Sequence, residues 1–203
     1  MDINMKSKTN TKNGFTIVEL LIVIVVIGIL AAITIVAFNG IQDRARNTKT
    51  ENAIAQYSKA LITYATIHGQ YPAGSVNSPC LGLASDYGAN NCWGGTVDVS
   101  FNTTLEDHLG SGLPQIDTEC QMMYGGCRRG AHLHKASTVP LDSQPHSWYI
   151  GYMLRGSGVP CTAARQAGGS WSSALSTPNS HQYIETHSGT TLCRVILPNP
   201  AEL

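Results

Sequence analysis

The strongest pattern along the chain is an unbroken apolar run over residues 20–38, which contains no charged residue. At about 1.5 Å per helical residue this run spans about 28 Å, close to the roughly 30 Å hydrocarbon core of a bilayer. Glu19 stands directly before the run. A carboxylate inside such a segment costs about 2.5–3.5 kcal/mol on insertion scales, so Glu19 is a candidate functional residue. The pattern predicts a membrane-spanning helix over residues 15–38 with one acid near its start.

After Phe38 the apolar pattern changes from continuous to amphipathic. Because no proline occurs between Phe15 and Pro72, one helix is expected to continue through residues 39–71, with Gly69 and Pro72 as its stop signals. Apolar positions recur every three or four residues at Ile54, Tyr57, Leu61, Tyr64 and His68, flanked by Ala53, Ala60 and Ile67. The opposite, polar face is expected to carry Asn47, Lys49, Glu51 and Lys59. Such a half-buried helix needs an apolar surface to lie against.

The remainder, residues 72–203, has the patterning of a β-rich extracytoplasmic domain. Residues 96–101 alternate as a short strand would, and residues 105–109 are long enough for one helical turn. Residues 147–155 place Trp148, Ile150, Tyr152 and Leu154 on one face, and residues 182–186 and 191–197 predict a hairpin around Ser188-Gly189. The expected fold class is α+β, a long helix packed on an antiparallel sheet.

Composition and cysteine count support an exported domain. The 203 residues contain 13 Lys and Arg against 13 Asp and Glu, so no basic excess points to nucleic acid. All cysteines lie beyond the helix, and their even number predicts three disulfides. The sequence does not choose among the possible connectivities, but short loops close most easily, so we expect neighbour pairing. The expected pairs are Cys80–Cys92, Cys120–Cys127 and Cys161–Cys193. Zinc is the rival interpretation, and no Cys-x-x-Cys pair supports it.

The first 14 residues predict a leader that stays in the cytoplasm. Lys6, Lys8 and Lys12 precede the apolar run, and positive charge favours the cytoplasmic side. Residues beyond Phe38 are then expected to face outward. A small residue at Gly14 would let a peptidase approach the backbone closely.

The junction Gly14-Phe15-Thr16-Ile17-Val18-Glu19 and the apolar run after it resemble the class III signal of type IV prepilins and pseudopilins. The stretch Tyr64 to Pro72, with Gly69-Gln70-Tyr71-Pro72 at its end, resembles the end of the long helix in many members of that family. The resemblance implies a pilin-like fold and a cut by prepilin peptidase between Gly14 and Phe15, followed by N-methylation of Phe15. It also implies that Glu19 pairs with the new amine of Phe15 on a neighbouring subunit. Gly28 matches a glycine common in pilin helices, and small residues there allow helices to approach closely.

The expected function is therefore that of a structural subunit, a major or minor pilin of a type IV pilus. Its expected partners are further copies, other pilins, prepilin peptidase and the cell membrane before export to the surface filament. One alternative is a pseudopilin of a type II secretion or DNA-uptake system, and another is a membrane-anchored binding domain or enzyme. No nucleophile motif supports a hydrolase, and we expect no cofactor and no metal.

Two weaker signals lie after Cys127. His132 and His134 share one face of a predicted strand, yet without a third ligand a surface strand is favoured over a metal site. One local basic patch could contact DNA or a host surface, although a solvated loop is the simpler interpretation. Its members are Arg128, Arg129, His132, His134 and Lys135.

Overall fold

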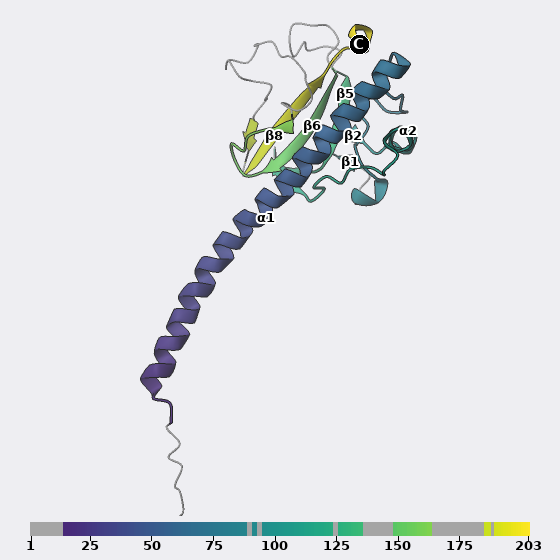
Figure 1. Ribbon diagram of the computed structural model, residues 1–203. Coiled ribbons are helices and arrows are strands. Elements are labelled where there is room, and N and C mark those ends of the chain that lie inside the picture. The colour runs from purple at the N-terminus through teal and green to yellow at the C-terminus, as the bar shows by residue number, and fades with distance from the viewer. Residues whose placement is uncertain are drawn as a thin grey trace, which may run out of the picture. The chain divides into compact units, whose positions relative to one another are not determined.

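The computed structural model describes residues 14–88, 91–92, 95–123, 126–135, 148–163, 185–187 and 189–203. The predictions for residues 1–13, for residues 182–184 and for Ser188 lie outside these ranges. The chain divides into two units, Met1–Ile41 and Gln42–Leu203, and one helix, α1 (Ile17–His68), runs through the boundary between them (Figure 1).

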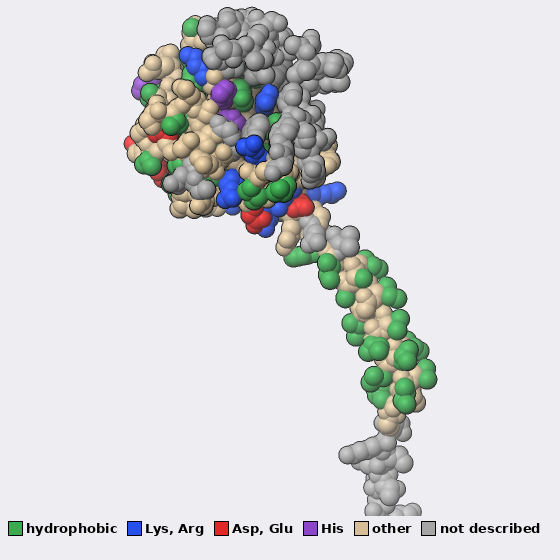
Figure 2. Space-filling model, turned by 180° about the vertical axis from the view of Figure 1, so that it is seen from behind, with side chains coloured by type: hydrophobic (Ala, Val, Ile, Leu, Met, Phe, Trp, Pro, Cys, Tyr) green, Lys and Arg blue, Asp and Glu red, His purple; other side chains and the backbone are tan. Residues whose placement is uncertain are grey.

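In the first unit the apolar side chains of α1 are exposed, and Figure 2 shows one face of this stretch covered with them. Ile17, Leu21, Ile24 and Ile29 are each more than half exposed. By length and composition alone, α1 contains a stretch able to cross a membrane. A helix that is apolar all round is stable where lipid or other apolar helices surround it.

In the second unit α1 buries the predicted face. Ile54, Tyr57 and Leu61 have no exposed surface, and the helix ends where Gly69 adopts a left-handed φ of 70° and donates its N–H to the Ala65 carbonyl at 2.8 Å. The predicted stripe is wrong beyond Tyr64. Ile67 is 64% exposed and Ala65 is buried instead.

The buried face of α1 packs on a four-stranded antiparallel sheet with the strand order β5-β6-β8-β7. Its strands are β5 (Ala131–Lys135), β6 (Trp148–Arg155), β7 (Glu185–His187) and β8 (Thr190–Leu197). Ile150 and Tyr152 face the core, as the alternation predicted, and β7 pairs with β8 in the predicted hairpin. Two short hairpins lie outside this sheet, β1 (Asn91–Cys92) with β2 (Gly95–Thr96) and β3 (Gln121–Met123) with β4 (Gly126–Arg128). The α+β class is confirmed.

The predicted strand over residues 96–101 is wrong, because a helix begins inside it. Helix α2 (Val99–Leu109) contains the predicted single turn and buries Phe101 and Leu105 in the core. The signal that decides is Asp98, whose carboxylate accepts the Phe101 N–H at 3.1 Å as an N-cap. Short one-turn 3-10 helices lie at η1 (Ala84–Asp86) and η2 (Pro200–Glu202).

Asp98 also ties the loop after Pro72 to α2, since its carboxylate accepts hydrogen bonds from the backbone N–H and the hydroxyl of Ser75. Burial raises the pKa of Asp98, but hydrogen bonds from Ser100, Phe101 and Ser75 outweigh that effect and lower it to about 2. The folded-state pKa is thus below the unfolded one. The carboxylate therefore stabilises the fold above about pH 4, and this contribution is lost as the pH falls towards 2.

Asp98→Ala is expected to lower the free energy of unfolding by about 1–3 kcal/mol at pH 7, through loss of the cap and of the Ser75 contacts. Asp98→Asn, which can still cap, should cost less. Urea unfolding at pH 7 and pH 3 measures both. The gap between wild type and Asp98→Ala should shrink at pH 3, and a gap that does not change with pH would contradict this role of the carboxylate.

The six cysteines form the disulfides Cys80–Cys92, Cys120–Cys127 and Cys161–Cys193, which are the neighbour pairs expected from the sequence. Cys161–Cys193 is fully buried and belongs to the core between sheet and helix. It fastens the segment after β6 to the middle of β8. Cys120–Cys127 closes the hairpin of β3 and β4, where Cys127 is exposed.

Glu51 does not lie on the polar face of α1, where the sequence pattern placed it. It is 6% exposed and accepts hydrogen bonds from the Tyr152 hydroxyl at 3.1 Å, from the Thr162 N–H at 3.0 Å and from the Ala163 N–H. Burial raises the pKa of Glu51, against the lowering effect of these bonds. The carboxylate therefore joins the helix to β6 and to the segment that follows the disulfide at Cys161.

Candidate assembly site at the start of the long helix

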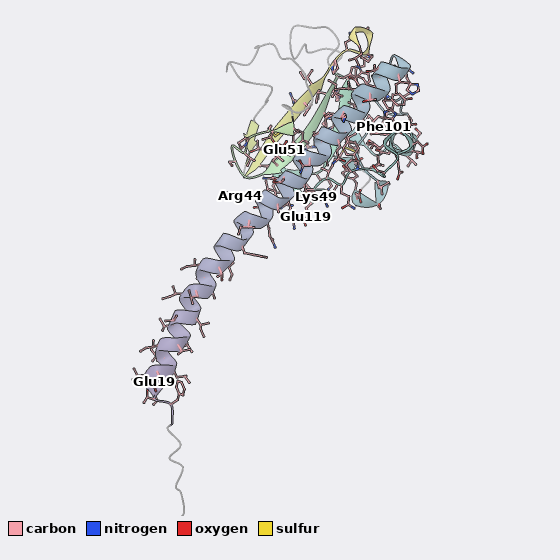
Figure 3. The ribbon with its side chains drawn as sticks, viewed as in Figure 1. Glu19, Arg44, Lys49, Glu51, Phe101 and Glu119 are labelled. Atoms are coloured by element: carbon pink, nitrogen blue, oxygen red, sulfur yellow. A yellow bond between two sulfur atoms is a disulfide. The ribbon has the colours of Figure 1, made fainter. Side chains whose placement is uncertain are left out.

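The first turn of α1 is closed by reciprocal hydrogen bonds between Thr16 and Glu19. The Thr16 hydroxyl accepts the Glu19 N–H at 3.2 Å, and the Glu19 carboxylate accepts the Thr16 N–H at 2.9 Å. The Thr16 hydroxyl also donates to the same carboxylate oxygen, at 2.7 Å. This is a capping box, which satisfies two backbone donors that a helix start otherwise leaves unpaired. Figure 3 shows Glu19 at this end of the helix.

The capping box was missed in the sequence analysis, although its signal was present. Threonine followed three residues later by glutamate, just before an apolar run, is the standard pattern. The structure thus gives Glu19 a role within one chain, which is to fix the point where α1 begins. The charge expected to meet a neighbour's amine is held in the first turn of the helix.

The Gly14–Phe15 bond lies before the helix, in residues without regular secondary structure. Phe15 is 79% exposed, and a β-carbon built on Gly14 would meet no atom within 4 Å. Nothing in the described chain therefore shields this bond.

Gly28 lies in the middle of the apolar stretch of α1, and a β-carbon there would also meet no atom within 4 Å. Ala31 follows one turn later, and its carbonyl accepts the Thr34 hydroxyl at 2.9 Å. Small side chains at these positions leave the helix backbone open to close approach by another helix. The isolated chain supplies no such partner among its described residues.

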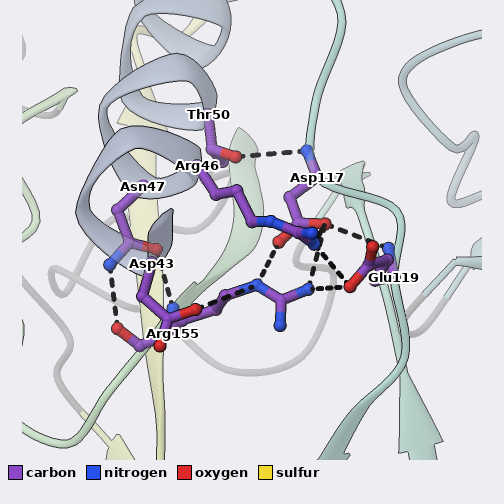
Figure 4. A network of polar contacts seen from close by, with 7 residues as sticks. All are labelled: Asp43, Arg46, Asn47, Thr50, Asp117, Glu119 and Arg155. Atoms are coloured by element: carbon purple, nitrogen blue, oxygen red, sulfur yellow. Dashed lines mark hydrogen bonds and ion pairs between the residues drawn. The ribbon is translucent and has the colours of Figure 1, made fainter. Parts of the chain in front are cut away.

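The charges that follow the apolar stretch form a network inside the second unit (Figure 4). Arg155, at the end of β6, donates from Nε to Asp117 at 2.6 Å and from Nη2 to Glu119 at 2.7 Å. Arg46 of α1 forms ion pairs with the same two carboxylates. The arginine side chains thus bridge the helix, the sheet and the loop after α2. Hydrogen bonds raise the pKa of Arg155, so its charge is permanent.

Two further contacts hold α1 in this network. The Asn47 side chain donates to the Arg155 carbonyl and accepts the Arg155 N–H, each at 2.8 Å. The Thr50 hydroxyl accepts the Asp117 N–H at 3.2 Å. Sequence reasoning missed this network, because partners such as Asn47 and Arg155 lie 108 positions apart and no local pattern joins them. It fixes the rotation of α1 about its own axis against the sheet.

The histidine pair and the basic patch do not form one surface. His132 and His134 share a face, with ring centroids 6.0 Å apart, but His132 is 3% exposed, so the expected surface strand is wrong there. Burial, His134 and Arg194 lower the pKa of His132 to about 3, which leaves it neutral. Lys135 lies on the other face, beside Trp148. No group of three or more potential metal ligands occurs in the part of the chain that the structure describes.

Part of the chain is similar to a known family model and to two curated proteins. A family model described as the prokaryotic N-terminal methylation motif matches residues 9–35. The type IV major alpha-pilin of Moraxella bovis is 36% identical over 80 residues, which make up 37% of this chain and 50% of that protein. The fimbrial protein of Neisseria meningitidis serogroup A / serotype 4A is 38% identical over 77 residues, which make up 36% of this chain and 42% of that protein.

The chain thus spans half or less of the length of the curated relatives it matches. No solved structure matches it. The matched motif includes the junction at Gly14 and Phe15, the capping acid Glu19 and the helix glycine Gly28. The chain therefore carries the prokaryotic N-terminal methylation motif and is similar to a type IV major alpha-pilin and a fimbrial protein over slightly more than a third of its length.

Proposed function

We propose that the chain is a structural, non-catalytic subunit of a type IV pilus. It is inserted in the cell membrane as a precursor with residues 1–14 as a leader. Prepilin peptidase cuts between Gly14 and Phe15 and methylates the new amine. The mature chain leaves the bilayer and assembles through residues 15–38, with residues 42–203 forming the body of the subunit on the surface.

The observation that carries this proposal is the contrast within α1. Its first half exposes apolar side chains on all sides, while its second half is fixed to a disulfide-stapled domain by a buried apolar face and by ion pairs. Exposure of this much apolar surface to water is unfavourable, so the first half of α1 needs lipid or a bundle of similar helices around it. Cutting the exposed Gly14–Phe15 bond at the start of α1 would let the helix move from lipid into a bundle of similar helices.

Glu19 is proposed to guide the assembly. After the cut, Phe15 carries a free amine, and in a bundle of apolar helices the carboxylate of Glu19 needs a positive partner. A neighbour's methylated amine supplies one. Such a pair sets the axial register of an incoming helix, which a surface of Leu, Ile and Val does not fix. The capping box holds the carboxylate ready at the helix start.

Two substitutions separate the cap from the charge. Glu19→Gln keeps an acceptor for the Thr16 N–H, because glutamine also closes a capping box, but it removes the charge. Glu19→Ala removes both. We expect both variants to be cut after Gly14 and to lose surface filaments at least tenfold, measured by quantitative shearing and immunoblot. Wild-type filament yield from Glu19→Gln would show that the cap is sufficient and that no charge pair is needed.

The distribution of the chain between membrane and filament tests the proposed function. A pilin is expected in sheared surface filaments at high abundance if major and in trace amounts if minor. A pseudopilin would assemble without extended surface filaments. A chain confined to the membrane fraction with its leader attached would overturn the proposal in favour of an anchored extracytoplasmic domain.

A further inference from the structure

A pocket of about 600 Å³ lies in the second unit where α1 ends. The turn after the helix, the β5–β6 edge of the sheet and the C-terminal segment line it, and one side is open to solvent. Its volume is within the usual range for small-molecule sites, roughly 300–1,000 Å³. The described residues that carry its chemistry are Gln70, Tyr71, Asn77, Lys135, Trp148 and Asn199.

The aromatic side of the pocket is rigid. Tyr71 is buried and donates its hydroxyl to the Pro198 carbonyl at 2.6 Å, and its ring packs against Trp148 with centroids 5.1 Å apart. Trp148 is half-buried and stays in register between Lys135 and Leu197 of the neighbouring strands. The contact with the buried Tyr71 ring and the strand pairing on both sides hold the Trp148 ring in place without a ligand.

Lys135 is the one charged side chain among the described residues that line the pocket. Its ammonium lies 5.5 Å from the centre of the Trp148 ring. That cation–π contact is weak because the lysine is exposed. An anion in the pocket would draw the ammonium from the ring at little cost, and the ring face would then be free to stack on the ligand.

Carboxamides complete the lining. Asn199 uses its oxygen to accept the Ala201 N–H at 3.2 Å, which orients the amide and leaves its NH₂ group for a ligand. Asn77 and Gln70 are exposed at the pocket wall. Carboxamides donate to and accept from hydroxyl groups, so the lining suits a ligand with several hydroxyls.

We propose that this pocket binds a carboxylate-bearing sugar, a uronic acid or another acidic saccharide. The sugar carboxylate pairs with Lys135, its apolar ring face stacks on Trp148 and its hydroxyls bond to the carboxamides. A nucleotide fits less well, since one ammonium does not balance two or more phosphate charges. The proposal goes beyond the filament role and does not depend on the cut at Gly14.

Galacturonate and galactose test the proposal, because they differ only at C6, which is a carboxylate in galacturonate and a hydroxymethyl group in galactose. The full chain in detergent micelles is titrated with each sugar and binding is followed by saturation-transfer NMR. Galacturonate is expected to bind with a millimolar Kd and galactose at least tenfold more weakly. Lys135→Gln should weaken galacturonate binding about tenfold or more. The matched control is Lys59→Gln, an exposed α1 lysine outside the pocket, which should bind as wild type does.

Three results would overturn the proposal. They are no galacturonate binding at tens of millimolar, equal binding of the two sugars, and unchanged binding by Lys135→Gln. Because Lys135 is exposed and makes no hydrogen bond or ion pair with described residues, the variant should keep the wild-type melting temperature. Weaker galacturonate binding by Lys135→Gln would then report the loss of the lysine from the pocket and not a loss of folding.

Discussion

Gly14→Val is expected to leave the chain uncut, so that it accumulates in the membrane with residues 1–14 attached and forms no filaments. The folded chain gives no reason for this effect, since no atom lies within 4 Å of a β-carbon at Gly14. The effect arises in the peptidase, where a branched side chain would obstruct access to the backbone on either side of the bond. Immunoblots that resolve precursor from mature chain measure it.

The matched control is Gly40→Val. Gly40 also has open space around it and lies within α1, away from the junction. Valine forms helices better than glycine does, so the helix should be kept and the cut should proceed normally. If Gly14→Val were processed as efficiently as Gly40→Val, the bond after Gly14 would not be the cleavage site.

The second large effect is expected from the buried disulfide. Replacing Cys161 and Cys193 by alanine opens a loop with a sequence separation of 32, and the loop-entropy model assigns that closure about 3–4 kcal/mol. The replacement also removes sulfur atoms from the core between helix and sheet, which lowers the free energy of unfolding further. We therefore expect the double variant to melt about 10 °C lower than the wild type, on the usual scale for a domain of this size.

Cys120 and Cys127 provide the control for this effect. Their disulfide has a sequence separation of 7 and Cys127 is exposed, so their replacement should cost about 2–3 kcal/mol by the same model and leave the core intact. Thermal unfolding of both variants, without reductant, measures the difference. A larger drop in melting temperature on replacing Cys120 and Cys127 than on replacing Cys161 and Cys193 would contradict the structural account of the core.

Local patterns predicted those parts of the fold that depend on neighbours in sequence. The apolar run is exposed and the face with Ile54 and Leu61 is buried, as their patterns predict. In β6 the predicted alternation is only half right, because the residues between Ile150, Tyr152 and Leu154 are buried as well. The same reasoning misplaced Glu51. It stands one turn before Ile54, on the same face, where its polarity alone predicts exposure. Partners more than 100 positions away keep it buried.

The start of α2 and the charged network show two other limits of prediction from local sequence patterns. Alternation over residues 96–101 predicts a strand, but the capping carboxylate of Asp98 favours a helix from the next residue. The ion pairs of Arg155 with Asp117 and Glu119 depend on how the loop after α2 meets the sheet, and that arrangement exists only in the tertiary structure. At the junction, by contrast, Thr16 and Glu19 are close in sequence, and their contact could have been predicted.

The most direct test of the account is the N-terminal residue of the chain recovered from surface filaments. Intact mass and N-terminal sequencing, with and without reduction, should give a chain that begins at Phe15, carries one methyl group on its amine and contains no free thiol. A filament chain that begins at Met1, or at any residue inside α1, would contradict the proposal that the bond after Gly14 is cut to release the assembly helix.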